Sequence, residues 1–378
     1  MDRRETEHLL DAIRKALQAG SSAALATIVR VRGSAYRREG MRMLVREDGT
    51  YECALSGGCL EPSVAEVARR VMATGEPTIV AYDLADDSLW GLGMGCSGAV
   101  DILIEHLDER FGRDEVMLAW LDVLQRGASA TLVTALDGAI ERRFARMLVL
   151  ASGDRRGSLG DVALDREAAE RARGRMAATF SRSGAERLGH RELFFDVSTP
   201  PPSIVVFGAG LDAIPLVRQA WMLGFSVTVV DVRSAHLTTE AFPHATLVPA
   251  HFSEFRARVP IHRDSCLVVM NHHLERDRES LRFALESDAA YIGVLGPRVR
   301  YQKLLAELAA AGFTPSSAQV SRVRSPIGLS LGAETPEEVA LSILGEILAV
   351  QRGRAGGFLD GSSHGLHEPD ATRALVDK

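Results

Sequence analysis

Apolar and polar positions alternate near the start of the chain in a way that predicts a short α/β unit. One face of a first helix is apolar, at Leu9, Leu10, Ile13 and Leu17. Continuous apolar segments at 23–31 and 41–46 predict two buried strands, and Asp48-Gly49 predicts a hairpin turn after them. A glycine turn at 56–61 then leads into a predicted helix that ends at Gly75.

The same pattern recurs at a constant distance of 104 residues. Two segments match without a gap: 26–29 (ATIV) with 130–133 (ATLV), and 42–45 (RMLV) with 146–149 (RMLV). Such a self-match indicates that one structural unit has been duplicated. We therefore predict an N-terminal domain at 1–195 that contains two copies, at about 1–105 and 106–195.

The two copies keep their apolar positions but differ in their loops. At the same spacing, four loop residues of the first copy change type: Gly33 to Asp137, Arg37 to Glu141, Gly40 to Phe144 and Cys59 to Ala163. This difference favours a binding site in the first copy, because its glycines, arginine and thiol have no counterpart in the second. The alternative is that the loops diverged without constraint.

A run of three prolines marks the main predicted domain boundary, because Pro200-Pro201-Pro202 favours a stiff, extended linker. Beyond it, predicted strands alternate with helices, with the strands at 204–207, 226–230, 245–248, 266–270 and 291–295. This alternation is typical of a parallel, doubly wound sheet. The predicted fold class is therefore α/β, with the duplicated N-terminal domain followed by a Rossmann-like domain at 196–352.

The end of the second domain carries local signals of its own. Thr335-Pro336-Glu337-Glu338 predicts the start of a last long helix, with a capping box and a proline at the first helical position. After Arg352 the chain is rich in glycine, serine, histidine and charged residues. We predict a disordered tail at 353–378.

The first strand of the second domain leads into a glycine turn of the type that binds dinucleotides. Gly208 permits the tight turn, Gly210 lets the backbone approach a pyrophosphate, and the helix N-terminus favours negative charge. Asp231 ends the next strand, where a carboxylate can hydrogen-bond a ribose. Asp212 is unusual in such a turn, because its carboxylate can compete with a phosphate for the same backbone amides.

Two further segments follow predicted strands of the same sheet. His272 and His273 come directly after the strand at 266–270, so they are expected at the carboxyl edge of the sheet, where such folds bind ligands. A histidine there could act as acid, base or ligand, or could simply cap a helix. Arg298 follows the strand at 291–295 in a position suited to a phosphate, and ordinary surface charge is the alternative.

A cysteine occupies the glycine turn of the first copy. Ser56-Gly57-Gly58-Cys59 places a thiol where a helix begins, and the field of that helix favours the reactive thiolate. Arg37 and Arg38 could bring positive charge to it from the loop that also holds Gly33 and Ser34. The alternative is a buried, inert thiol. The spacings of the cysteines and histidines fit no familiar zinc site.

Composition narrows the class of protein further. The 378 residues are 46% hydrophobic and 25% charged with a net charge of −6, values typical of a globular protein. Basic residues are scattered among acidic ones, so we expect no nucleic-acid partner. A charged start and the lack of an apolar run of roughly 18 residues predict no membrane segment and a cytoplasmic location. Four scattered cysteines predict no disulfide framework: Cys53, Cys59, Cys96 and Cys266.

Together these segments resemble the XdhC/CoxI family, accessory proteins for the maturation of molybdenum hydroxylases such as xanthine dehydrogenase and carbon monoxide dehydrogenase. The similarity covers nearly everything before the tail. It rests on segments 33–40 with 42–45, 56–61, 91–98 ahead of Asp101, 207–213, 272–277 and 328–338. Two positions depart from the pattern, because Asn271 stands where serine is expected and Ser97 where glycine is expected.

The resemblance implies a cofactor-binding chaperone more than a stand-alone enzyme. It would bind the molybdenum cofactor, as molybdopterin or its cytosine dinucleotide, support its sulfuration by a cysteine desulfurase, and transfer it to an apo molybdenum hydroxylase. The arginine loop and the Rossmann turn are both candidate sites for the phosphate end of this cofactor. Under this interpretation the Cys59 thiolate could ligate molybdenum or relay sulfur. Paired domains with glycine loops are compatible with a homodimer.

Two other interpretations remain open at this point. An NAD(P)-dependent oxidoreductase would bind its dinucleotide or another nucleotide through Gly208, Gly210 and Asp231, with His272 as acid or base. A docking protein would use none of these turns for a ligand.

Overall fold

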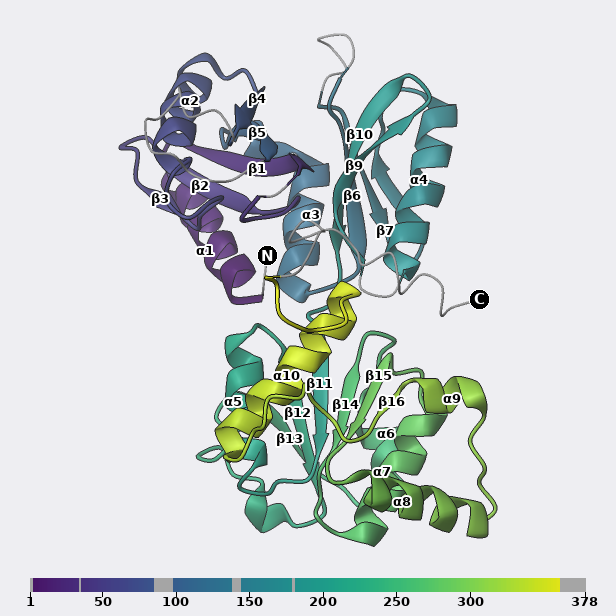
Figure 1. Ribbon diagram of the computed structural model, residues 1–378. Helices are drawn as coiled ribbons and strands as arrows, with labels where there is room; N and C mark the ends of the chain where they lie inside the picture. Colours follow the sequence, from purple (N-terminus) through teal and green to yellow (C-terminus); the bar gives the residue numbers. More distant parts are fainter. Residues whose placement is uncertain (1–2, 34, 85–97, 138–143, 179–180, 361–378) are drawn as a thin grey trace. The chain divides into compact units, whose positions relative to one another are not determined.

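The computed structural model describes residues 3–33, 35–84, 98–137, 144–178 and 181–360 (Figure 1). The chain forms two compact units, the first ending at Pro200 and the second beginning at Pro201. Within the described ranges, no helix has the length and apolar character needed to cross a membrane.

The first unit contains two five-stranded sheets with the same strand order. The first sheet is ordered β3-β2-β1-β5-β4, and the second is ordered β8-β7-β6-β10-β9 (Figure 1). The elements of the first copy are α1 (Arg3–Ala19), β1 (Ala23–Arg32), β2 (Arg42–Arg46), β3 (Tyr51–Glu52), α2 (Glu61–Thr74), β4 (Thr78–Asp83) and β5 (Ala99–His106). Those of the second are α3 (Glu115–Arg126), β6 (Ala130–Ala135), β7 (Arg146–Leu150), β8 (Arg155–Gly157), α4 (Val162–Ala177), β9 (Gly184–Leu188) and β10 (Arg191–Ser198).

Hydrogen-bond register shows which residues of the two copies are equivalent. Thr27 pairs with Arg42 in the first sheet, and Thr134 pairs with Arg146 in the second. Arg42 and Arg146 keep the spacing of 104, but the first strand is shifted by 107, so the sequence match of 26–29 with 130–133 is three residues out of register. The cause is that the segment from Thr27 to Arg42 is three residues longer than the segment from Thr134 to Arg146, because β1 continues past Thr27 to Arg32.

Each copy covers one face of its sheet with its own helix and shares the other face. Helix α2 packs on the first sheet through residues such as Val64, and α4 packs on the second through residues such as Ala168. Helices α1 and α3 lie in a single core with Leu25 of β1 and Leu132 of β6. The two copies are therefore joined by a continuous apolar core.

The second unit is a six-stranded parallel sheet in the order β13-β12-β11-β14-β15-β16 (Figure 1). Its strands are β11 (Ser203–Phe207), β12 (Ser226–Asp231), β13 (Ala245–Pro249), β14 (Cys266–Val269), β15 (Tyr291–Val294) and β16 (Val323–Arg324). Its helices are α5 (Ala213–Met222), α6 (Phe255–Arg258), α7 (Leu274–Glu286), α8 (Arg298–Ala310), α9 (Ser317–Ser321) and α10 (Pro336–Arg352). The strand order reverses between β11 and β14, which is where doubly wound folds bind ligands.

Helices cover both faces of this sheet, as continuous apolar strands require. Helices α5 and α10 pack on one face, and α6, α7 and α8 pack on the other. The predicted capping box at Thr335 and Glu338 is present at the start of α10. The predicted α/β fold class is confirmed. In the predicted tail, residues 353–360 form no helix or strand, and 361–378 lie outside the described residues.

Candidate functional site

The loops that distinguish the first copy leave one edge of its sheet. The loop after β1 connects to the start of β2, and β3 ends beside the middle of that strand, where Glu52 pairs with Leu44. Ala35 from the loop after β1 lies in the same buried cluster as Leu55 and Leu60 from the turn before α2. The predicted arginine loop and cysteine turn therefore lie together. Ser34 and Cys96 lie outside the described residues.

Ser56 organises the turn that carries Cys59. Its Oγ accepts hydrogen bonds from the amides of Gly58, Cys59 and Leu60, at 3.2, 3.1 and 3.1 Å. The same hydroxyl donates to Glu61 Oε2 at 2.5 Å, and Cys59 Sγ lies 3.4 Å from it. Cys59 is half-buried, so the predicted thiol lies at the surface of a fixed turn. The amides of Gly58, Cys59 and Leu60 therefore already have a hydrogen-bond acceptor, the Ser56 hydroxyl.

A buried carboxylate braces this turn, and the brace is present in both copies. Glu61 is fully buried and accepts from the amides of Leu55 at 2.9 Å and Ser56 at 2.7 Å. The equivalent Asp165 accepts from the amide of Leu159 at 2.7 Å. The brace is thus part of the duplicated scaffold, whereas the thiol is specific to the first copy.

The two glycines before Cys59 lie against open space. A Cβ atom added to Gly57 or Gly58 would meet no atom within 4 Å. Gly58 has a φ of 112°, which explains its identity, but Gly57 has no such backbone requirement. Within the described structure nothing therefore demands a glycine at position 57, and close approach of another molecule is a reason for one.

The arginines of the first copy's loop already have partners. Arg37 makes a two-point ion pair with Glu5, at 2.7 and 3.3 Å, and Arg38 lies 3.3 Å from Glu39. Gly33 supplies the backbone bend before them, with a φ of 68°. A phosphate at these arginines would have to compete with their carboxylate partners.

A buried charge cluster that no sequence motif predicted joins the two copies. Arg42 of the first copy pairs with Asp196 of the second, and Arg146 of the second pairs with Glu105 of the first. Register makes the two pairs equivalent, since Leu25 pairs with Glu105 and Leu132 with Asp196. The only signal in the sequence was an arginine recurring at the start of two apolar strands.

This cluster surrounds a cavity of about 20 Å³, which is room for one water molecule. Burial lowers the pKa of Arg42 to about 9, which still leaves the guanidinium charged at neutral pH, and the nearby Glu105 carboxylate acts in the opposite direction. The two buried ion pairs of this cluster thus hold the two copies together.

In the second unit the glycine turn sits against the neighbouring strand. Gly208 has a φ of 120°, and a Cβ there would come within 2.5 Å of the Met270 carbonyl oxygen. At Gly210 an added Cβ would lie 2.6 Å from Asp212 Oδ1. Gly208 is therefore required by its backbone conformation and by close packing at the switch point between β11 and β14, whereas at Gly210 an added side chain would displace the Asp212 carboxylate.

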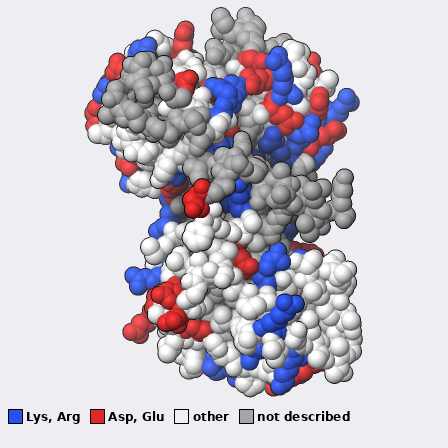
Figure 2. Space-filling view, viewed as in Figure 1, with Lys and Arg blue, Asp and Glu red and all other residues white. Residues whose placement is uncertain are grey.

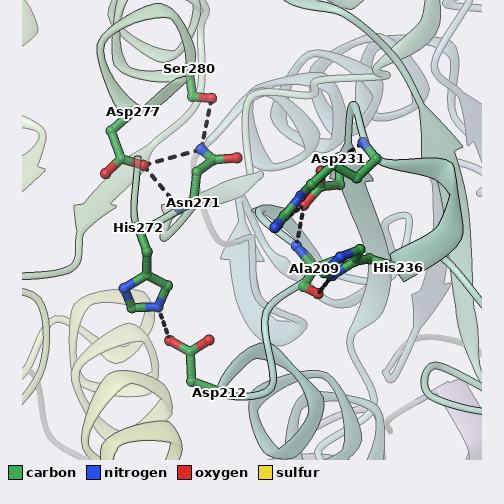
Figure 3. Close-up of polar contacts among 9 residues, drawn as sticks. Ala209, Asp212, Asp231, His236, Asn271, His272, Asp277 and Ser280 are labelled. Atoms are coloured by element: carbon green, nitrogen blue, oxygen red, sulfur yellow. Dashed lines mark hydrogen bonds and ion pairs between the residues drawn. The ribbon is translucent and has the colours of Figure 1, made fainter. Parts of the chain in front are cut away.

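Both carboxylate oxygens of Asp231 already accept hydrogen bonds from residues of this chain. Its Oδ2 accepts from the Ala209 amide at 2.8 Å and from Arg233 at 2.7 Å, and its Oδ1 accepts from the Arg233 amide and Nε at 2.8 and 3.0 Å (Figure 3). Burial acts to raise its pKa, but these hydrogen bonds outweigh burial and hold the pKa at about 2. The carboxylate predicted to bind a ribose thus holds the glycine turn in place.

Asp212 does not occupy the amides of its turn. It makes no side-chain cap bond to α5, and its Oδ2 lies 2.6 Å from His272 Nε2 (Figure 3). His272 has a φ of 56°, a conformation uncommon for a residue other than glycine. His273 is exposed at the N-cap of α7 and makes no side-chain cap bond. The structure thus brings Asp212 and His272 together and leaves His273 apart.

The arginine that anchors this edge is not the predicted one. Asp277 is buried and accepts from Arg300 at 2.5 Å and from the amide of Asn271 at 2.9 Å. Arg298 is exposed at the start of α8, and its side chain makes no hydrogen bond to a residue that the structure describes. Arg298 is therefore the arginine that remains accessible to a ligand.

Charges of both signs are interspersed on the surface of the first unit. On the face shown in Figure 2, blue Lys and Arg side chains lie close to red Asp and Glu side chains. The exposed side chain of Arg32, for example, donates to the buried carboxylate of Asp101 at 2.6 and 2.9 Å. Positive charge is thus neutralised locally.

The fold and these sites define a two-part protein in which a Rossmann unit follows a duplicated α/β unit. Residues 204–347 match the model of the XdhC Rossmann domain, and residues 16–83 match the model of the XdhC and CoxI family. The chain belongs to the XdhC and CoxI family, which confirms the resemblance seen in the sequence.

Similar proteins cover both units. The chain is 32% identical over 350 residues to a Bacillus subtilis protein described as a probable subunit of xanthine dehydrogenase, covering 91% of this chain and 97% of that protein. It is 25% identical over 338 residues to the molybdenum cofactor insertion chaperone PaoD of Escherichia coli, covering 89% and 86%. A crystal structure described as a xanthine dehydrogenase from Bacillus halodurans matches with a TM-score of 0.73 and 29% identity, covering 96% and 98%.

Proposed function

We propose that this protein binds the molybdenum cofactor and inserts it into a molybdenum hydroxylase of the xanthine dehydrogenase type. Two similar proteins support this, because one is named a molybdenum cofactor insertion chaperone and the other a probable subunit of xanthine dehydrogenase, and the similarity covers both units. The observation that carries the proposal is the Cys59 turn, which places a thiol beside open glycines in the first copy alone.

The Cys59 turn is better suited to supply one ligand to the molybdenum of a bound cofactor than to hold a metal ion by itself. Within the described residues, no group of three or more histidine, cysteine or acidic side chains could hold a metal ion. A metal bound here would therefore arrive with most of its ligands already in place, as in a cofactor. One soft thiolate from Cys59 is the kind of ligand that such a centre accepts from a protein.

The phosphate end of the cofactor has two candidate positions, one in each unit. In the first unit, Arg37 and Arg38 would exchange their carboxylate partners for the phosphate. In the second, the amides of Gly210 and Leu211 just before α5 would donate hydrogen bonds to it, because neither Asp212 nor another residue of the described structure accepts from them.

The proposal extends to sulfuration and to partners. A cysteine desulfurase carries a persulfide, and attack of the Cys59 thiolate on its outer sulfur would form a Cys59 persulfide and release the desulfurase thiolate. The sulfur would then be available to the bound cofactor. The apo molybdenum hydroxylase is the acceptor of the finished cofactor, and a homodimer is the proposed assembly.

An NAD(P)-dependent oxidoreductase is less well supported. Dinucleotide binding at such a turn uses the acid that ends the second strand to hold the ribose. Here Asp231 is 2% exposed, and both of its oxygens accept hydrogen bonds from Ala209 and Arg233. Asp231, which would hold the ribose in such an oxidoreductase, thus already has hydrogen-bond partners within the chain.

Purification from cells that make molybdenum cofactor tests the proposal. We expect the full-length protein, purified without oxygen, to retain pterin, measured as fluorescence after oxidation and release. We also expect no nicotinamide absorbance change with candidate hydroxylase substrates. Protein that retains no pterin, or that reduces NAD(P), would contradict the proposal.

A further inference from the structure

The second unit contains a cavity that none of the sites above uses. It has a volume of about 300 Å³ and lies at the carboxyl edge of the sheet, next to the end of β15. Its lining comes from segments 295–297 and 326–333 and from the first turns of α10. Segment 328–338 was singled out in the sequence, but the proposed cofactor site gives it no role.

Glycines allow segment 327–329, which lines the cavity, to pack closely against β15 and α10. A Cβ at Gly293 of β15 would overlap Ile327, and a Cβ at Gly328 would overlap Ser342 of α10. An added Cβ at Gly345 would come within 2.9 Å of Leu329. These approaches fix segment 327–329 between the sheet edge and α10.

Hydrogen bonds hold the same segment. Glu346 Oε2 accepts from the Gly328 amide at 2.8 Å and from the Tyr291 hydroxyl at 2.6 Å. Ser342 accepts the Leu329 amide at 3.1 Å through its carbonyl and donates its hydroxyl to the Leu329 carbonyl at 2.7 Å. The floor of the cavity is therefore built in advance, which lowers the cost of binding a ligand.

The character of the walls indicates what could enter. No residue lining the cavity carries a charge, and most of the lining is apolar, including Leu295, Pro297, Ile327 and Val339. In the described structure, the amides of Ser330, Gly332 and Ala333 have no hydrogen-bond acceptor. Apolar walls with a few unused polar groups suit a flat heteroaromatic ring, whose faces are apolar and whose edge accepts hydrogen bonds.

We propose that this cavity binds the base of a nucleoside monophosphate. The volume lies at the lower end of the range for small-molecule sites, roughly 300 to 1,000 Å³, so it fits a ring rather than a whole dinucleotide. Strands β15, β14 and β11 are adjacent, and at about 4.8 Å per strand the glycine turn lies roughly 10 Å from the cavity. A ribose phosphate attached to the base would extend along the carboxyl edge toward that turn.

Calorimetric titration of the full-length protein separates ring binding from phosphate binding. The probes are AMP, GMP, CMP and UMP, with ribose 5-phosphate as the ligand that lacks a base. We expect at least one nucleotide to bind about tenfold or more tightly than ribose 5-phosphate. Equal affinity for all five, or no detectable binding of any nucleotide, would overturn the proposal.

A pair of matched variants, one that fills the cavity and one that adds the same bulk outside it, tests where the base binds. Ala333→Phe adds a ring to the lining, and Ala309→Phe adds the same bulk to an exposed position of α8 outside it. We expect Ala333→Phe to remove the preference for a nucleotide over ribose 5-phosphate and Ala309→Phe to keep it. If Ala333→Phe fails to fold by circular dichroism, Ser330→Trp fills the cavity from an exposed position. A filled cavity that still prefers the nucleotide would overturn the proposal.

This experiment is independent of the proposed cofactor function. It uses free nucleotides and leaves Cys59 unchanged, so its failure would not alter pterin retention. Conversely, a protein that retained no pterin could still bind a base in this cavity.

Discussion

His272 Nε2 lies 2.6 Å from Asp212 Oδ2, and this pair holds the Asp212 carboxylate beside the helix start without a bond to its amides. The turn is therefore open to a phosphate although it contains an acidic residue. His272 adopts a φ of 56° where it meets Asp212. The histidine thus has a definite effect on the turn, which is to hold the Asp212 carboxylate away from the amides.

We expect His272→Ala to weaken AMP binding by about two- to fivefold, the size of a charge effect at a helix end. The reason is that the unpaired Asp212 carboxylate would then compete for the amides of the turn. The double variant Asp212→Asn with His272→Ala should recover the lost affinity. Calorimetry measures both, and tighter AMP binding by His272→Ala alone would refute the effect assigned to the pair.

Asp231 should make the second unit acid-sensitive. Its pKa is lowered to about 2 in the folded protein from an ordinary value of 3.8, so its contribution is present above pH 4 and is lost as the pH falls toward 2. A shift of this size corresponds to about 2 kcal/mol at neutral pH. We expect Asp231→Asn to lower the free energy of unfolding by about that amount at pH 7 and by little at pH 2.

Urea denaturation at pH 7 and pH 2 measures this difference. Glu240→Gln is the control, because Glu240 is an exposed acid of the same unit. An Asp231→Asn variant as stable as the parent at pH 7 would mean that the carboxylate does not hold the glycine turn.

The buried charges between the copies should be costly to break singly. Arg42→Met leaves Asp196 buried without its partner, and we expect a loss of about 3–5 kcal/mol in the free energy of unfolding. The double variant Arg42→Met with Asp196→Leu should recover most of it. Arg146→Met should behave like Arg42→Met, since the two pairs are equivalent. Chemical denaturation measures the free energy of unfolding of each variant. A single variant that loses less than about 1 kcal/mol would show that the ion pair does not hold the copies together.

Ser56 should control the reactivity of Cys59. Ser56→Ala leaves the amides of Gly58, Cys59 and Leu60 without their acceptor, so the turn should open more often. We expect N-ethylmaleimide to label Cys59 roughly fivefold faster, the effect of about 1 kcal/mol from lost hydrogen bonds. Peptide mass spectrometry follows the labelling.

Asp165→Asn is the control for this experiment, because it weakens the equivalent turn of the second copy, in which Asp165 accepts from the Leu159 amide. The labelling rate of Cys59 should not change in it. An unchanged rate in Ser56→Ala would contradict the role given to the Ser56 hydroxyl.

Local patterns predicted most of the fold. Strands such as 204–207 and 226–230, the bend at Gly208 and the capping box at Thr335 depend on neighbouring residues, so they can be inferred from short segments. The duplication was visible for the same reason. Its register was wrong in the first strand, because the longer strand β1 places three extra residues between Thr27 and Arg42, and a gapless match cannot detect them.

Long-range partners could not be inferred in this way. Arg42 meets Asp196 across 154 positions, and no local pattern links them. Asp231 satisfied every sequence rule for a ribose ligand, but Arg233 two residues later occupies it. The arginine loop and the cysteine turn of the first copy do meet at one edge, while their use as a binding site and the roles of their residues remain predictions.

The proposed function assigns to Cys59 a part in holding the molybdenum cofactor. A comparison of bound pterin per protein after anaerobic purification of the parent, Cys59→Ser and Cys53→Ser tests this role, with Cys53 as the half-buried cysteine outside the turn. We predict that Cys59→Ser loses most of the pterin and that Cys53→Ser retains the parent amount. Equal retention by all three proteins would contradict the claim.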